Sequence, residues 1–309
     1  VLVTGSAGFL GRHLLPLLLE RGDTVVALYH HTLPLAHERV IPIQGDISKD
    51  GDWQNKIPKV DSVYHLAGLI DLSSSHHKKV WRVNVEGTQR MIGVTQKTQA
   101  SHFYYVSTAF TQNRNPYELS KSRAESDVLL FGEHSGVKIT VFKPSIIVGH
   151  TRFPVAEESH GLYQMVKTIA QVHRRLEPIR QKVEGTLRLP PIELVFRIPG
   201  DEELQLDIVP VDWVAETIVL TYGTGVFWLT NANSPKLKDL AEWVGELLWL
   251  NIKFIPKFKP SPVEAIFQRA VKSFLPYFKP CNVFTPSLDS CPVVGKEFIQ
   301  RTALVTLLR

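Results

Sequence analysis

Three short groups of residues in this chain have the types and spacing that hydride and proton transfer need. They are a glycine-rich turn, a pair of hydroxyl residues, and a tyrosine four positions before a lysine. In chain order these are Gly5-Ser6-Ala7-Gly8-Phe9-Leu10-Gly11, Ser107-Thr108 and Tyr117-x-x-x-Lys121. A second Tyr-x-x-x-Lys pair occurs at Tyr163 and Lys167, so this spacing alone is a weak signal. The positions of the two pairs among the predicted strands and helices must decide between them.

The chemistry open to Tyr117 is donation of a proton to a carbonyl oxygen while a hydride is added to the carbon. A free tyrosine has a pKa of about 10, so a neighbouring ammonium group helps to stabilise the phenolate. Four positions along a helix place Lys121 on the same face as Tyr117. The hydroxyl of Thr108, at the end of a predicted strand, can donate a hydrogen bond to the same carbonyl oxygen.

Buried strands alternate with helices through the first half of the chain, which predicts an α/β fold with a doubly wound parallel sheet of about six strands. The predicted strands are VLVTG, TVVALYH, VIPIQGD, SVYHLAG, FYYVST and KITVFKPSIIVG. Tyr117 lies in the helix between the last two strands, directly after the strand that ends in Ser107-Thr108. Tyr163 follows the end of this alternation, which favours Tyr117 and Lys121 as the catalytic pair and makes Tyr163 a packing or pocket residue.

The alternation of predicted strands and helices ends after Gly149. We predict a Rossmann domain over 1–150 and a smaller, mainly substrate-binding lobe over 151–309, with about 208–232 returning to the main sheet. Amphipathic helices are predicted at 237–248 and 263–275. The aromatic stripe Phe267, Phe274 and Phe278 favours packing on the core, and peripheral membrane contact by this C-terminal region stays an alternative.

The glycine-rich turn lies between a strand and a helix, which is the context of a loop that binds a dinucleotide pyrophosphate. The second strand ends at Tyr29-His30 instead of a carboxylate, and Arg12 with His30 offers positive charge for a 2′-phosphate. NADPH is therefore favoured, with NADH as the alternative. Further predicted cofactor-binding residues, besides the turn itself, Tyr117 and Lys121, are Asp46, Ile47, Leu66, Ala67, Gly68, Asn84, Ser107, Pro144 and Ile146.

Composition excludes several classes of protein. The formal net charge is +5, but the basic residues are scattered, which argues against a nucleic-acid partner. Two cysteines are too few for a disulfide framework, and we predict a reducing, cytoplasmic location. His30-His31 and His76-His77 are adjacent pairs without zinc spacing, so no metal site is predicted. Oligomeric state is left open, with a homodimer as one expectation, and the absence of an initiator Met leaves targeting open.

The motifs TGSAGFLG, HLAG, NVEGT, YVSTAF, NPYELSKSRAE and FKPSIIVG together resemble the extended short-chain dehydrogenase/reductase superfamily over Val1 to Gly149. YVSTAF, NPYELSK and IVPVDWVAETIV are most similar to its thioester reductase and fatty acyl-CoA reductase branch. The resemblance implies a catalytic triad of Thr108, Tyr117 and Lys121. Relatives in this branch usually carry a longer segment between the first two, although nine residues extended reach roughly 30 Å.

The resemblance implies an NAD(P)H-dependent oxidoreductase that reduces an acyl thioester, on coenzyme A or a carrier protein, to an aldehyde or alcohol. Alternatives within the superfamily are a sterol-like or flavonoid-like alcohol dehydrogenase or ketoreductase, and a nucleotide-sugar epimerase or dehydratase. A nucleotide-binding scaffold without turnover is a further alternative. The complete set of Thr108, Tyr117 and Lys121 argues against it.

Overall fold

The computed structural model describes residues 1–153, 161–188, 195–279, 284–288 and 291–308. The chain divides into two compact units. The first comprises Val1–Ser145, Val211–Thr230 and Phe284–Cys291, and the second comprises Ile146–Pro210, Asn231–Val283 and Pro292–Arg309. The first unit ends at Ser145, against a predicted border at 150. It also takes in 211–230, which lie within the predicted return of about 208–232, and 284–291, which were predicted to belong to the second lobe.

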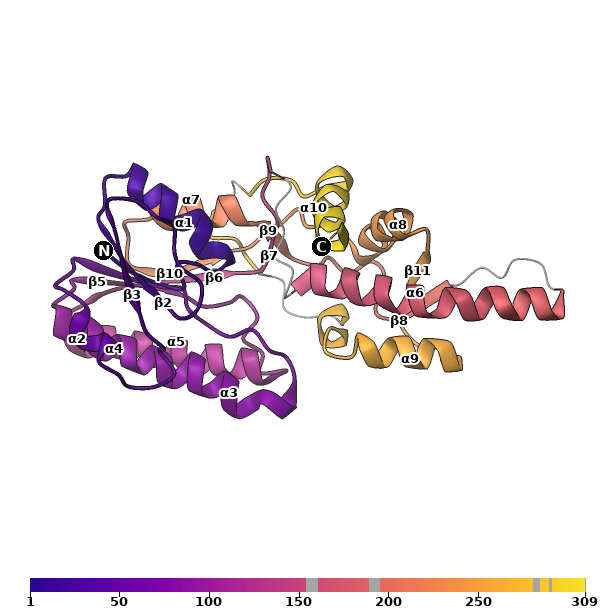
Figure 1. Cartoon of the computed structure of the whole chain (residues 1–309), viewed down its shortest axis with the longest axis horizontal. Coiled ribbons are helices and arrows are strands. Elements are labelled where there is room, and N and C mark those ends of the chain that lie inside the picture. The colour runs from indigo at the N-terminus through magenta and orange to yellow at the C-terminus, as the bar shows by residue number, and fades with distance from the viewer. Residues whose placement is uncertain (154–160, 189–194, 280–283, 289–290, 309) are drawn as a thin grey trace. The chain divides into compact units, whose positions relative to one another are not determined.

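The first unit is built on a seven-stranded sheet with the order β10-β6-β5-β4-β1-β2-β3 (Figure 1). All neighbouring strands are parallel. The strands are β1 Leu2–Thr4, β2 Val25–Tyr29, β3 Val40–Gln44, β4 Ser62–His65, β5 His102–Val106, β6 Lys138–Pro144 and β10 Gly225–Leu229. The predicted doubly wound α/β fold is confirmed, and β10 brings the number of strands to seven.

Helices cover both faces of this sheet. On one face α1 packs against α7, and on the other α3 and α4 pack against α5 (Figure 1). The helical segments are α1 Phe9–Glu20, α2 Trp53–Lys56, η1 Ser74–His76, α3 His77–Trp81, η2 Arg82–Glu86, α4 Gly87–Thr98, α5 Pro116–Ser135 and α7 Val211–Leu220. Between the α4–α5 side and the sheet lies a hydrophobic core that includes Leu2, Val63, Phe103, Tyr105, Val128 and Val141. This core fixes the carboxyl ends of the strands, where the predicted site residues lie.

One predicted strand is two strands in the structure. The predicted strand KITVFKPSIIVG has the Lys143-Pro144 step at its end. In the structure β6 ends at Pro144, and β7 (Ile146–Val148) pairs with β9 (Ile208–Pro210) in a separate sheet. Proline has no N–H to continue a ladder. The change of partner comes directly after Ser145, since the Ser145 N–H still donates to the Leu229 carbonyl of β10 at 3.1 Å whereas the Ile146 N–H donates to the Asp207 carbonyl at 3.3 Å.

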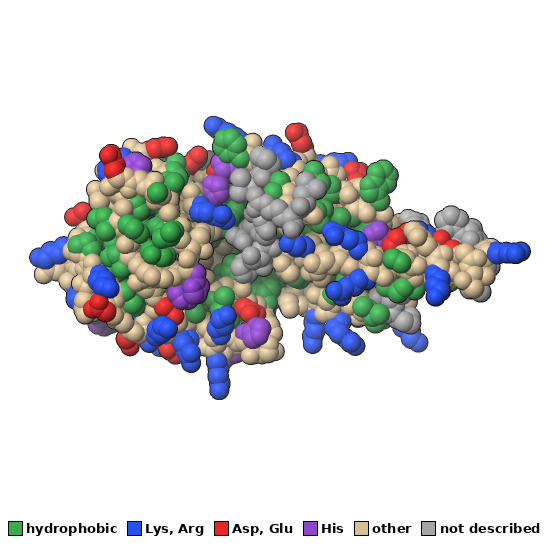
Figure 2. Space-filling view, viewed as in Figure 1, with side chains coloured by type: hydrophobic (Ala, Val, Ile, Leu, Met, Phe, Trp, Pro, Cys, Tyr) green, Lys and Arg blue, Asp and Glu red, His purple; other side chains and the backbone are tan. Residues whose placement is uncertain are grey.

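The second unit contains two parallel pairs of strands, β7 with β9 and β8 (Val195–Pro199) with β11 (Asn251–Ile255). Its helical segments are α6 Gly161–Leu187, α8 Leu237–Leu248, α9 Pro262–Ala270, η3 Leu275–Phe278 and α10 Lys296–Leu308. Phe267 and Phe278 are buried, as a stripe that packs on the core requires. None of the helices described in this structure is long and apolar enough to cross a membrane. On the face shown in Figure 2, Lys and Arg side chains are scattered and form no continuous stripe.

Candidate active site

The turn between β1 and α1 is shaped by close backbone contacts. Gly5 has φ +71°, and a Cβ atom on Gly11 would lie 2.1 Å from the Gly5 carbonyl oxygen. Gly8 begins α1 without a side-chain cap, so a ligand is free to accept hydrogen bonds from the first amides of the helix. The Ser6 hydroxyl is buried and has no hydrogen-bond partner among the described residues. Glycines that cannot carry a side chain and an unpaired buried hydroxyl fit a bound pyrophosphate.

The ends of β2 and β3 lie beside this turn. His30 Nε2 lies 3.6 Å from Asp46 Oδ2, and the His30 ring centroid lies 3.6 Å from that of His31. Burial raises the pKa of Asp46, but hydrogen bonds from Ser48 and the charges of His30 and Lys49 outweigh it and leave the pKa below its usual value. The His30 side chain therefore lies beside the Asp46 carboxylate, and the sequence did not predict this pair.

Arg12 and Ile47 differ in what they offer a cofactor. The Arg12 side chain is exposed at the first turn of α1, where it can meet a phosphate. The Ile47 side chain is buried in the hydrophobic core, and atoms of that side chain would lie 3.0 and 3.1 Å from a Cβ built on Gly87. The backbone of Ile47 is thus the part of this residue that is left to hold the adenine, as predicted for Asp46-Ile47.

A buried chain of hydrogen bonds supports the end of β4. His65 Nδ1 lies 2.7 Å from Thr4 Oγ1, and His65 Nε2 lies 3.0 Å from Thr88 Oγ1. Burial, together with the charge of Lys121, lowers the pKa of His65 to about 3, so the ring stays neutral. The Ala67 N–H donates to Thr4 Oγ1 at 3.1 Å. These contacts hold the backbone of Leu66, Ala67 and Gly68 beside the glycine turn, where a Cβ on Gly5 would lie 2.9 Å from Ala67 N.

Asn84 joins this loop to the catalytic helix. Its Oδ1 accepts from the Leu69 N–H at 2.7 Å, and its Nδ2 donates to the Leu69 carbonyl at 3.0 Å and to Ser120 Oγ at 2.9 Å. Asn84 lies in the π-helical turn η2, a feature common at functional sites. Both N–H groups of the Asn84 amide are used within the protein, so Asn84 positions α5 and the β4 loop.

The structure brings Thr108 and Tyr117 together. Burial raises the pKa of the Tyr117 phenol to about 12, and a hydrogen bond from the Thr108 side chain opposes that rise. The Thr108 oxygen also accepts from the Phe110 N–H at 3.2 Å. This contact uses one lone pair of the Thr108 oxygen, and the hydroxyl keeps its hydrogen, which it can donate to an oxyanion.

Lys121 is buried on the same helix, one turn after Tyr117. Its Nζ donates to the Val106 carbonyl at 2.6 Å and lies 4.2 Å from the centroid of the Tyr105 ring. A Cβ built on Gly68 would lie 4.0 Å from this Nζ, so Lys121 borders the end of β4. Burial lowers the pKa of Lys121 to about 7, against the raising effect of the Glu125 carboxylate.

The buried Lys121 makes stability depend on pH. Because its pKa is lower in the folded chain than in the unfolded chain, the unfolded state binds more protons and stability rises with pH above about 7. From pH 6 to pH 9 we expect the free energy of unfolding of the native protein to rise by about 2–3 kcal/mol relative to that of Lys121→Met. Urea unfolding of both proteins at the two pH values measures this difference. Equal pH dependence would contradict a buried, easily deprotonated lysine.

The short segment between Thr108 and Tyr117 is held by its own ion pair. Arg114 Nε and Nη2 donate to the fully buried carboxylate of Glu118 at 2.9 and 2.7 Å. Asn115 caps α5 by accepting from the Glu118 N–H at 3.0 Å. The nine-position interval is therefore long enough to join the strand to the helix with both catalytic side chains in contact.

Comparison with known proteins identifies the family. The model of the NAD dependent epimerase/dehydratase family matches residues 1–186, more than half of the 309 residues. The chain belongs to this family. It is an α/β oxidoreductase or epimerase family whose relatives include NAD-dependent enzymes.

Curated relatives of this epimerase/dehydratase chain match it in part. A 3-beta-hydroxysteroid dehydrogenase of Mycolicibacterium neoaurum is 33% identical over 115 residues, 35% of this chain and 31% of the relative. A UDP-2-acetamido-2,6-beta-L-arabino-hexul-4-ose reductase of Pseudomonas aeruginosa is 31% identical over 150 residues, 48% of this chain and 36% of the relative. The chain thus spans about a third of the length of these relatives.

Solved structures share the epimerase/dehydratase fold over most of the chain. The terminal R domain of the myxalamid PKS-NRPS biosynthetic pathway has a TM-score of 0.74 at 18% identity, covering 99% of this chain and 90% of that one. A UDP-glucose 4-epimerase of Thermotoga maritima, bound to UDP-glucose, has a TM-score of 0.67 at 18% identity, covering 100% and 99%. At these identities the likeness shows the fold alone.

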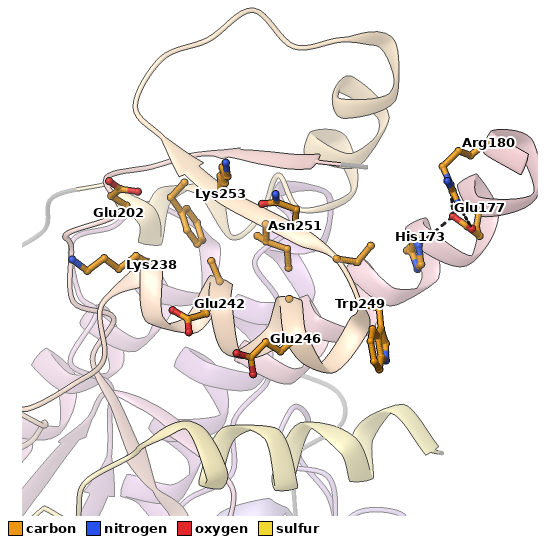
Figure 3. A pocket seen from close by; sticks show the side chains of 15 residues that line it. His173, Glu177, Arg180, Glu202, Lys238, Glu242, Glu246, Trp249, Asn251 and Lys253 are labelled. Atoms are coloured by element: carbon orange, nitrogen blue, oxygen red, sulfur yellow. Dashed lines mark hydrogen bonds and ion pairs between the residues drawn. The ribbon is translucent and has the colours of Figure 1, made fainter. Parts of the chain in front are cut away.

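A hollow in the second unit has a volume of about 1230 Å³ (Figure 3). It is lined by α6, α8 and β11, with Trp249 exposed at the end of α8. Arg180 at its edge is held between Glu177 and Glu184 at 2.5 and 2.6 Å. Thr108, Tyr117 and Lys121 do not line it, so it is distinct from the candidate active site.

The remaining predicted residues lie in different places. Ser107 and Pro144 lie at the carboxyl ends of β5 and β6 in the first unit, whereas Ile146 begins β7 in the second. Sequence reasoning missed Glu125 and Lys143, whose carboxylate and ammonium groups lie 2.7 Å apart near Ser107. A lysine inside the apolar strand KITVFKP was the available signal, because a buried ammonium needs a partner.

Proposed function

We propose that this protein is an NADPH-dependent oxidoreductase that reduces an acyl thioester, carried on coenzyme A or a carrier protein, to an aldehyde or alcohol. Bound NADPH supplies the hydride. Thr108 donates a hydrogen bond to the carbonyl oxygen, and Tyr117 gives it a proton as the carbon becomes tetrahedral. The C–S bond of the resulting hemithioacetal then breaks, releasing aldehyde and thiol.

The observation that carries the proposal is the closeness of the Thr108 hydroxyl to the Tyr117 phenol, whose pKa it lowers against the effect of burial, with Lys121 buried one turn further along α5. A donor pair at one oxygen suits reduction of a carbonyl. The similarity in fold to a PKS-NRPS terminal R domain supports a thioester as the substrate class, since this similarity extends over nearly the whole chain. The motifs YVSTAF and NPYELSK favour the same branch.

A second candidate is the oxidation of a sterol-like secondary alcohol. It is favoured by the 3-beta-hydroxysteroid dehydrogenase of M. neoaurum, which is 33% identical over the matched segment. In this direction Tyr117 accepts the proton of the hydroxyl group instead of donating one. Both candidates use the same residues, so substrate tests must separate them.

The deciding experiment measures NADPH consumption with acyl-CoA thioesters of several chain lengths, and NAD⁺ or NADP⁺ reduction with 3β-hydroxysteroids. UDP-sugars, assayed for epimerised product, form a third arm. Aldehyde or alcohol formed from a thioester supports the proposal. Turnover of a secondary alcohol or a UDP-sugar with none of any thioester overturns it.

The preference for NADPH is tested by Arg12→Ala. If the exposed guanidinium of Arg12 meets the 2′-phosphate, its loss weakens NADPH binding about tenfold, as expected for one hydrogen bond to a charged group. NADH affinity should stay unchanged, because NADH lacks that phosphate. Fluorescence titration measures both affinities, with Arg123→Ala, an exposed arginine on α5, as the matched control. Equal losses for NADPH and NADH would contradict the assignment.

A further inference from the structure

We infer that Glu125, held by Lys143, is a positioning residue with two effects. It fixes the direction of the Ser107 hydroxyl, and its negative charge stabilises the ammonium form of Lys121. This inference rests on the proposed function, because it concerns the same site. Glu125 does not belong to the motifs that define the triad, and it acts through other side chains.

Glu125 lies on the catalytic face of α5, one turn after Lys121 and two turns after Tyr117. Its carboxylate accepts from Ser107 Oγ at 2.6 Å. Both of its oxygens accept from Lys143 Nζ, at 2.7 and 2.8 Å. Glu125 therefore joins the end of β5, the end of β6 and the catalytic helix through three short hydrogen bonds.

The ion pair between Glu125 and Lys143 is almost removed from water, with side-chain exposures of 14% and 5%. The Lys143 ammonium also lies 4.7 Å from the centroid of the Trp228 ring. Burial of two charges costs about as much as their attraction returns, so such a pair adds little net stability. Loss of one partner, in contrast, leaves the other charge uncompensated. The ion pair is therefore explained better by its position beside the triad than by a contribution to stability.

One consequence concerns Ser107. A hydroxyl group has a single hydrogen, and Ser107 donates it to Glu125, so only its lone pairs are left for a ligand. Ser107 can then accept from an amide such as a carboxamide N–H. Glu125 thereby makes Ser107 a hydrogen-bond acceptor toward a ligand.

The other consequence concerns Lys121. The groups that face it are Val106 O and the Tyr105 ring on β5, neutral His65 on β4, and Tyr117 and Glu125 on α5. Glu125 supplies the negative charge among them, and its effect on Lys121 favours the ammonium form. Removing that charge would also leave the Lys143 ammonium without a counter-charge, and both changes disfavour protonated Lys121.

The test is Glu125→Gln, which keeps the shape of the side chain and removes its charge. NADPH affinity is measured by fluorescence from pH 5.5 to 9.5, which needs no substrate. We expect binding about tenfold weaker near pH 7.5 and a pH midpoint about one unit lower than in the native protein. Asp127→Asn is the matched control on the same helix. Asp127 pairs with Arg123 at 3.0 Å, and its loss should leave the midpoint in place.

Coupling to Ser107 is tested by Ser107→Ala and the double variant Ser107→Ala with Glu125→Gln. If Glu125 acts through Ser107, their effects on NADPH affinity are less than additive, whereas the pH midpoint moves only with Glu125→Gln. Glu125→Gln with Lys143→Gln is a further variant without the unpaired ammonium, should the single variant unfold. An unchanged midpoint in a folded variant, or additive losses, would overturn the inference. Missing thioester turnover with a shifted midpoint would count against the proposed function alone.

Discussion

Tyr117→Phe should lower the rate of thioester reduction by roughly 10²–10⁴-fold, the usual contribution of a positioned general acid. The variant loses the phenolic proton but keeps the ring, and Lys121 still donates to the Val106 carbonyl. NADPH affinity should therefore change by less than about threefold. Single-turnover measurement of NADPH oxidation gives the rate, and fluorescence titration gives the affinity.

The second Tyr-x-x-x-Lys pair provides a matched control for this variant. The Tyr163 hydroxyl donates to Thr302 Oγ1 at 2.6 Å and accepts from the Gly149 N–H at 3.0 Å, inside the second unit. Tyr163→Phe should cost about 1 kcal/mol of stability and leave the rate unchanged. A Tyr117→Phe protein as fast as the native one, or a slow Tyr163→Phe protein, would refute the choice between the two tyrosines.

The sheet could be predicted because its signal is local. Most strands of the first unit are short apolar runs that alternate with helices, and this alternation predicts both the parallel pairing and the edge at which the chemistry lies. The end of β6 at the Lys143-Pro144 step was predicted, whereas β7 as a separate strand was not, because SIIVG is as apolar as the strand before it. Only the pairing of β7 with β9, which lies about sixty residues further along the chain, separates the two strands.

Site residues could be predicted where the residue type itself indicates the chemistry. Residues whose role depends on how their side chains pack were harder to predict. Thr108 and Tyr117 were identified from their places after a strand and at the start of a helix, and the structure puts them in contact. For Ile47 the sequence could not show that the side chain enters the core, because an isoleucine after a strand can point to the core or to a ligand. Glu125 was missed since a carboxylate in a helix rich in charged residues resembles a surface residue.

The glycine turn gives the other large expected effect. Gly11→Ala would place a Cβ 2.1 Å from the Gly5 carbonyl oxygen and 2.7 Å from Ser6 Cα, and both contacts are with backbone that cannot rotate away. The β1–α1 turn must then open, which we expect to cost about 1–3 kcal/mol of stability and to reduce NADPH affinity at least 100-fold. Urea unfolding and fluorescence titration measure the two effects.

Gly93→Ala is the control for this substitution, because a Cβ on Gly93 in α4 would meet nothing within 4 Å. Alanine is the better helix former, so this variant should be more stable by about 0.5–1 kcal/mol with unchanged NADPH affinity. The contrast separates the general effect of replacing glycine from the close approach at Gly11. Normal NADPH affinity in Gly11→Ala would show that the turn can relax, and that a cofactor does not depend on its tight form.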